Sequence, residues 1–107
     1  MKILSIIVPT LKENYPYLKL CIDSIKKYSQ NQHEIIVVIN NIKFEDIPIE
    51  IKEMVGVQVL HSEPQGQCMA VNLGVEKAVN EYVMVIDDDF VFPPNWERIL
   101  DKLEGKE

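Results

Sequence analysis

The sequence has little cysteine, histidine and glycine, and it has no long apolar run. It holds two cysteines, two histidines and four glycines in 107 residues. Cys21 and Cys68 are far apart and form no CxxC pair, which favours buried reduced thiols and a cytoplasmic location over a disulfide. His33 and His61 are isolated from each other and from the cysteines, which argues against a zinc site. No stretch reaches about 18 apolar residues, so no membrane span is expected.

Positive charge is also scarce. Eleven Lys and Arg face 17 Asp and Glu, which gives a net charge of −6. Nucleic-acid binding, which depends on neutralising many phosphates with Lys and Arg, is therefore not expected. An acidic protein can still bind one phosphate-bearing ligand through backbone N–H groups or a metal ion. The apolar run Ile3–Val8 near the N-terminus is too short for a signal peptide, and no small-residue cleavage site follows it.

Four short apolar runs predict the strands of a buried sheet. They alternate with segments of helical periodicity, and a short helical turn is expected near Pro48. Runs that are apolar throughout are typical of strands covered on both faces. The pattern predicts one α/β domain with a mainly parallel sheet of about four strands. The predicted strands are Ile3–Val8, Ile35–Ile39, Val57–Leu60 and Tyr82–Ile86, and the predicted helices run from Asn14 to Tyr28, from Gln67 to Val79 and from Pro93 to Gly105.

Polar or turn-forming residues follow each predicted strand. They are Pro9–Glu13, Asn40–Asn41, His61–Gly66 and Asp87–Asp89. In parallel α/β sheets ligands bind beyond the carboxyl ends of the strands, so these four segments are expected to meet at one edge. Gly66 precedes a helix, where it either lets an anion approach the backbone or forms a simple tight turn.

The three adjacent aspartates after the fourth strand are the strongest local signal. Along an extended chain, Asp87 and Asp89 point to one side and Asp88 to the other. Two carboxylates on one side suit a hard cation such as Mg²⁺ or Mn²⁺, which completes its coordination with waters and substrate phosphates. The alternative is a solvated acidic loop whose side chains bond local N–H groups.

Three longer segments resemble family 2 glycosyltransferases of the GT-A type. "SIIVPTLKENYPYLKLCIDSI" is similar to the opening V-P-[ST]-Y-N-E strand and helix of that family, and "HEIIVVINN" is similar to its second strand. "PQGQCMAVNLGVEKAVNEYVMVIDDD" is similar to its helix, fourth strand and D-x-D motif. The resemblance covers nearly the whole chain, and it implies a Rossmann-like, three-layer α/β/α fold.

The resemblance also implies a binding site for a nucleoside-diphosphate sugar, linked to UDP or GDP. Pro9, Thr10 and Glu13 would border the base and ribose, and Asn40 stands where the family has an acid that contacts the base. Gly66, Asn72, Asp87 and Asp88 would also lie on the nucleotide side. Asp87 and Asp89 would hold Mn²⁺ or Mg²⁺ on the diphosphate, where the cation stabilises the leaving group.

The sequence departs from the family pattern in residues and in length. Asn40 replaces the acid, Leu11-Lys12 replaces Tyr-Asn, Val71 replaces an Arg, and Asn80 replaces a small residue. Members of the family usually need about twice this chain, so residues 1–107 are expected to form the donor-binding half without the acceptor half. Sequence reasoning names no general base, because Asp101 and Glu104 fit a solvated helix face.

Two other functions are compatible with parts of the sequence pattern. One is a non-catalytic assembly module of the same fold, forming a homo-oligomer through an open sheet edge. The other is a phosphotransfer receiver domain, which needs an acidic pair after its first strand. The first predicted strand ends in Pro9-Thr10 instead, so the receiver reading is disfavoured.

Overall fold

The computed structural model describes residues 3–63 and 67–100, without the side chains of residues 67 and 68. The chain alternates strands and helices as the apolar periodicity predicts. The elements are β1 (Leu4–Thr10), η1 (Lys12–Asn14), α1 (Tyr15–Tyr28), β2 (Glu34–Asn40), η2 (Phe44–Asp46), α2 (Ile49–Lys52), β3 (Val57–Ser62), α3 (Gln67–Lys77) and β4 (Tyr82–Val85).

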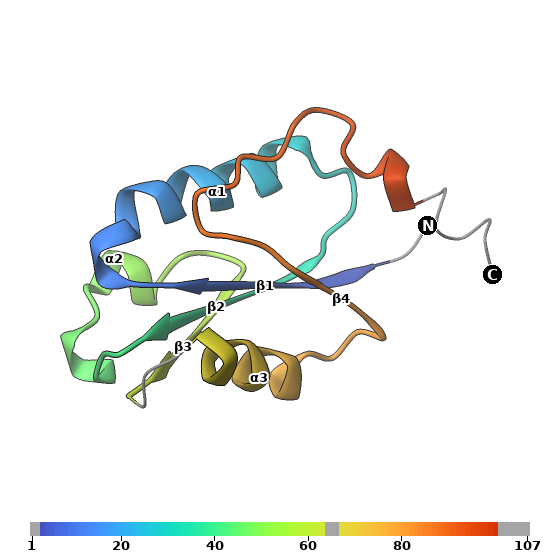
Figure 1. Cartoon of the computed structure of the whole chain (residues 1–107). Coiled ribbons are helices and arrows are strands. Elements are labelled where there is room, and N and C mark those ends of the chain that lie inside the picture. The colour runs from blue at the N-terminus through green and yellow to red at the C-terminus, as the bar shows by residue number, and fades with distance from the viewer. Residues whose placement is uncertain (1–2, 64–66, 101–107) are drawn as a thin grey trace.

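The strands form one four-stranded sheet in the order β3-β2-β1-β4, and every pairing in it is parallel. Helix α1 and the segment after β4 cover one face of this sheet, and α3 covers the other (Figure 1). The predicted three-layer α/β/α fold with a parallel sheet is therefore confirmed. No helix within residues 3–63 and 67–100 is both long enough and apolar enough to cross a membrane.

The sheet face under α1 carries the larger core. Alternate residues of β1 and β2, such as Ile6 and Val37, are fully buried against α1. The helix presents Leu18 and Ile22 to them at the spacing of one helical face. Phe92, from the segment after β4, joins the same core. This face therefore ties the end of the described chain to its beginning.

The opposite face is packed more closely by small residues of α3. Ala70 is fully buried against Ile7 and Val38. A Cβ atom placed on Gly74 would lie 2.5 Å from Cγ2 of Ile7, so a glycine is needed for α3 to approach β1 this closely. Small residues at positions 70 and 74 therefore let α3 pack closely on the sheet.

The predicted last helix begins later than expected. Residues 94–97 form turns, and Asn95 has a φ of 63°, so regular helix starts only at Arg98. The remainder of that prediction, including Asp101, Glu104 and Gly105, lies outside the described residues. Trp96 and Leu100 are nevertheless buried in the α1-face core, which explains the apolar periodicity of this segment.

Candidate functional site at the carboxyl edge of the sheet

The carboxyl ends of β1, β2 and β4 meet beside one cavity. Thr10 of β1 is in register with Ile39 of β2, and Ile86 N–H donates to the carbonyl of Ile7 at 3.0 Å just beyond β4. These pairings bring the residues after each strand to the same edge. The cavity has a volume of about 290 Å³, and we name it the aspartate cavity; its lining residues are Pro9, Thr10, Leu11, Asn14, Asn40, Asp87 and Asp88.

The three aspartates lie in a turn rather than in extended chain. Phe90 N–H donates to the carbonyl oxygen of Asp87 at 3.1 Å, and we call residues Asp87–Phe90 the aspartate turn. The extended conformation assumed for the aspartates is therefore wrong, but the separation of Asp88 from its two neighbours is found. Asp87 and Asp89 are exposed, whereas Asp88 is half-buried. The turn thus leaves two carboxylates open to solvent and draws one inward.

The inward carboxylate of Asp88 accepts two hydrogen bonds on a single oxygen. Thr10 Oγ1 donates to Asp88 Oδ2 at 2.7 Å, and Asn14 Nδ2 donates to the same oxygen at 3.0 Å. Thr10 is buried, with only 4% of its surface exposed, so its hydroxyl is shielded from solvent. Hydrogen bonds to a charged acceptor are stronger than those between neutral groups. These hydrogen bonds therefore hold Asp88 against the end of β1 and the η1 turn that follows it.

Asn40 brings an unpaired acceptor to the same cavity. Its Oδ1 atom is buried and has no hydrogen-bond partner among the described residues. A buried polar atom without a partner costs about 1–3 kcal/mol, so such atoms are few in folded proteins. A ligand that donates an N–H group to Asn40 would remove this cost.

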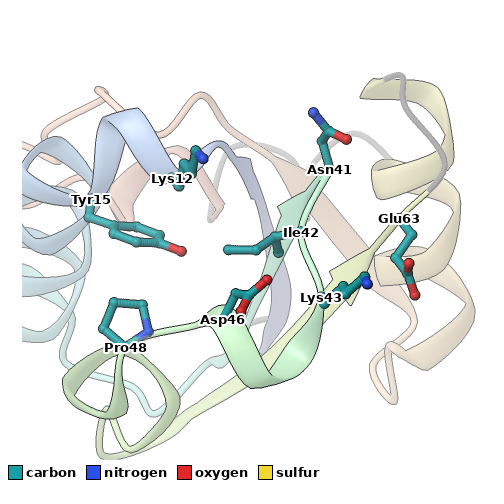
Figure 2. Close-up of a pocket in the computed structure, with 8 residues that line it drawn as sticks. All are labelled: Lys12, Tyr15, Asn41, Ile42, Lys43, Asp46, Pro48 and Glu63. Atoms are coloured by element: carbon teal, nitrogen blue, oxygen red, sulfur yellow. The ribbon is translucent and has the colours of Figure 1, made fainter.

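A larger cavity opens on the neighbouring part of the edge. Figure 2 shows that the hydroxyl of Tyr15 points into it, toward Ile42 and Asp46. The Tyr15 hydroxyl is buried and unpaired among the described residues, and burial followed by the charge of Glu13 raises its pKa. This Tyr15 cavity has a volume of about 640 Å³ and is lined by Lys12, Tyr15, Asn41, Ile42, Lys43, Asp46, Pro48 and Glu63.

Sequence reasoning missed the Tyr15 cavity and the contact of Asn14. Tyr15 is typical of the first residue of an amphipathic helix, and the spacing of apolar residues in this helix does not predict that its hydroxyl is buried. Lys43 and Asp46 lie between β2 and α2, in a segment that the sequence pattern predicts to be a loop. Asn14 reads as a helix cap. The available signal was their position in the segments that follow β1 and β2, because ligands bind beyond the carboxyl ends of parallel strands.

The remaining predicted site residues do not line the aspartate cavity. Glu13 is exposed on η1, and Asp89 is exposed in the aspartate turn. Asn72 lies on α3 and faces a third cavity of about 450 Å³, which is also lined by His61 and Glu63. Gly66 lies outside the described residues. The structure therefore brings together Pro9, Thr10, Asn40, Asp87 and Asp88 around this cavity, whereas Glu13, Asn72 and Asp89 are not among its lining residues.

Cys21 packs beneath this edge without taking part in it. Its side chain is fully buried and free of any disulfide. Burial, and then the negative charges of Asp88 and Asp89, raise the pKa of its thiol to about 12. The thiol therefore stays protonated at neutral pH, and the expectation of a buried reduced thiol is confirmed for Cys21. The side chain of Cys68 lies outside the description.

The donor set of the edge suits a cation that is shared with a ligand. Within residues 3–63 and 67–100, no group of three or more His, Cys, Asp or Glu side chains could hold a metal ion. Asp87 and Asp89 offer two exposed carboxylates, since Asp88 is engaged by Thr10 and Asn14. Mg²⁺ and Mn²⁺ are commonly held by one or two carboxylates, with waters and phosphates as the other ligands. The residues fit such a cation only if a phosphate-bearing ligand completes its coordination.

Comparison with known proteins identifies the family. The model of glycosyl transferase family 2 matches residues 5–107. EpsH of Bacillus subtilis (strain 168), a protein named as a glycosyltransferase, is 32% identical over an alignment of 88 residues, and the match covers 78% of this chain and 26% of EpsH. The resemblance found in the sequence motifs is thereby confirmed.

Solved structures of S. aureus TarS share the fold. TarS 1–349 matches with a TM-score of 0.68 and 24% identity, over 97% of this chain and 32% of that one. TarS 1–349 in complex with UDP gives a TM-score of 0.69 and 25% identity, over 97% and 31% of the two chains. The complex of TarS 1–349 with UDP-GlcNAc gives 0.65 and 23%, over 97% and 30%. This chain thus spans about a third or less of these relatives, and it belongs to glycosyl transferase family 2, with the GT-A fold.

Proposed function

We propose that this chain binds a nucleoside-diphosphate sugar together with Mn²⁺ or Mg²⁺, as the donor-binding part of a glycosyltransferase. The observation that carries the proposal is the meeting of Pro9, Thr10, Asn40, Asp87 and Asp88 around one cavity at the carboxyl edge of the sheet. The TarS structures in complex with UDP and UDP-GlcNAc make a UDP-linked sugar the first donor to test.

In this proposal Asp87 and Asp89 would hold the cation, which would supply Lewis-acid stabilisation of the negative charge on the leaving nucleoside diphosphate. Thr10 and Asn40 border the nucleoside. The buried Oδ1 of Asn40 accepts an N–H group of the base, which removes the cost of its missing partner. An amide can also donate, so Asn40 recognises a base through both kinds of hydrogen bond, whereas the acid usual in the family only accepts.

Cation and nucleotide should bind cooperatively. Two exposed carboxylates supply too few ligands for tight metal binding on their own, and the diphosphate supplies the rest. Thermodynamic linkage requires that the cation raise nucleotide affinity by the same factor as the nucleotide raises cation affinity.

Isothermal titration calorimetry of the folded protein with UDP, UDP-sugars and GDP, with Mn²⁺ or with EDTA, tests the proposal. We expect UDP affinity to fall by about tenfold or more when the cation is chelated. Asp89→Ala should remove the effect of Mn²⁺ on UDP binding. Asp23→Ala is the matched control, because Asp23 is an exposed carboxylate on the outer side of α1. If none of these nucleotides binds at millimolar concentration, the proposal is wrong.

A second candidate is an assembly module of the same fold, and the edge strand β4 favours it. Val83 and Val85 of this strand are 39% and 45% exposed, and β4 is the last strand of the described sheet. An apolar edge strand without a partner invites pairing with another strand. A stable dimer in light scattering, combined with no nucleotide affinity, would favour this candidate over donor binding.

A further inference from the structure

Asn14 occupies the N-cap position of α1 but does not act as a cap. Asn is among the strongest N-cap residues, because its side-chain oxygen accepts an N–H from the first turn. In this structure Asn14 makes no side-chain cap hydrogen bond, and Pro stands within the first two helical positions. Pro has no N–H to satisfy, which lowers the cost of an empty cap. The side chain of Asn14 is thus free for another contact.

That contact is with Asp88, 74 positions away in the sequence. Asn14 Nδ2 donates to Asp88 Oδ2 at 3.0 Å, on the oxygen that also accepts from Thr10. The main chain on either side of Asp88 is fixed separately. Ile86 N–H bonds to Ile7 in β1, and Phe92 N–H donates to Ser24 Oγ at 2.8 Å. The two donors on Asp88 therefore act at the middle of the aspartate turn.

Holding Asp88 inward has a consequence for its two neighbours. Three adjacent carboxylates repel one another, and a turn can present any of them to a ligand. With Asp88 turned toward Thr10 and Asn14, the exposed carboxylates are those of Asp87 and Asp89. We infer that Asn14 is a positioning residue, which together with Thr10 holds Asp88 so that Asp87 and Asp89 stay available to the cation. This inference rests on the proposed function.

Asn14→Ser separates positioning from a purely structural role. Serine is as good an N-cap as asparagine, so the variant can regain the cap of α1. Its side chain is one bond shorter and does not reach Asp88. We expect an unchanged or higher melting temperature, together with Mn²⁺-dependent UDP binding that is about tenfold weaker, as when partners behind metal ligands are removed. A residue that mattered only for stability would change both quantities in the same direction.

Asn14→Asp supplies a second variant with a strong cap. It places a carboxylate against the carboxylate of Asp88, which pushes the turn out of position. The loss of Mn²⁺-dependent UDP affinity should equal or exceed that of Asn14→Ser. Gln32→Ser is the control, because Gln32 is an exposed amide between α1 and β2 at the opposite end of the sheet.

The outcomes distinguish this inference from the proposed function. Wild-type protein that binds UDP with Mn²⁺, beside Asn14 variants that bind more weakly at an unchanged melting temperature, supports both. If the wild type binds and both Asn14 variants bind equally well, the positioning role is refuted and donor binding stands. If the Asn14 variants lower both the melting temperature and the UDP affinity, the positioning role is also refuted, because this result indicates a structural contact. A wild type that binds no nucleotide overturns both.

Discussion

The two ends of the sheet treat their polar groups in opposite ways. At the carboxyl edge, Tyr15 and Asn40 each bury a polar atom that has no partner among the described residues, and Asp87 and Asp89 stay exposed. At the amino edge, the carboxylate of Glu97 is buried and accepts several hydrogen bonds. One end is saturated with hydrogen bonds and the other is not. Unsatisfied groups near cavities indicate a place for a ligand, and saturated ones indicate structure.

The saturated end is built around the side chain of Glu97. Its carboxylate accepts from the backbone N–H of Gln30 at 2.7 Å, from the backbone and side chain of Asn31, and from His33 Nε2 at 2.6 Å. His33 Nδ1 accepts the N–H of Leu4 at 3.0 Å, which fixes the tautomer with its proton on Nε2. We call this set the Glu97 clasp. It joins the start of β1, the loop after α1 and the last described turn.

The difference between the two ends suggests that the amino edge contributes mainly stability, whereas the carboxyl edge contributes the groups that could bind a ligand. The donors of the Glu97 clasp converge on one carboxylate and join distant segments of the chain, which stabilises the fold. At the carboxyl edge, the buried Tyr15 hydroxyl and Asn40 Oδ1 have no partner among the described residues, which lowers the stability of the fold. The same two atoms remain available to a ligand. Variants at the two ends should therefore differ in which property they change.

Glu97→Ala should have the largest effect on stability. The variant removes the acceptor that Gln30, Asn31 and the buried His33 share, which costs on the order of 3 kcal/mol in the free energy of unfolding. Urea denaturation followed by circular dichroism measures this loss. Arg98→Ala, at the exposed next position, is the matched control and should change stability little. A loss below about 1 kcal/mol for Glu97→Ala would remove the distinction between the two ends.

Acid should weaken the Glu97 clasp in a defined pH range. Burial raises the pKa of Glu97, but the hydrogen bonds from Gln30, His33 and Asn31 outweigh it and lower the pKa from the ordinary value of 4.5. A carboxyl whose folded pKa is depressed contributes stability that is complete above its unfolded pKa and is lost as pH falls through the folded pKa. The clasp should therefore be fully effective at neutral pH and weaken below 4.5.

The matching measurement compares the wild type with Glu97→Gln across pH. The amide keeps the shape of the side chain but does not titrate in this range. We expect the stability difference between the two proteins to be constant from neutral pH down to about pH 5, and to shrink below it. A difference that stays constant down to pH 3 would mean that Glu97 contributes no charge-dependent stability.

The fold could be predicted from the sequence because strands that are buried on both faces of a sheet are apolar at almost every position. The apolar runs around Ile6 and Val37, and the small residues facing β1 from α3, predicted strands, helices and layers correctly. The carboxyl edge was predicted in outline for the same reason, since parallel strands end together. The details were not, because they depend on side-chain pairing between distant segments. Asn14 has the local features of a cap, and only the fold brings it to Asp88.

The Glu97 clasp escaped prediction for a related reason. His33 lies in a polar loop, and Glu97 follows Trp96 in a segment that reads as an ordinary amphipathic helix. Neither residue shows a motif, and 64 positions separate them in the sequence. Local periodicity reports which side chains are buried, but it carries no information about which distant polar groups meet.

Tyr15→Phe should have the smallest effect, and its sign tests the comparison most directly. Because the buried Tyr15 hydroxyl has no partner within residues 3–63 and 67–100, its removal costs no hydrogen bond to them and spares a desolvated polar group. We expect the free energy of unfolding to be unchanged or raised by up to about 1 kcal/mol. Tyr17→Phe is the control, since Tyr17 lies one residue beyond Pro16 with 56% of its surface exposed. If Tyr15→Phe instead destabilises the protein by more than about 1 kcal/mol, its hydroxyl is hydrogen-bonded in solution. The carboxyl edge would then be as saturated as the amino edge, and the difference between the two ends could not be attributed to ligand binding.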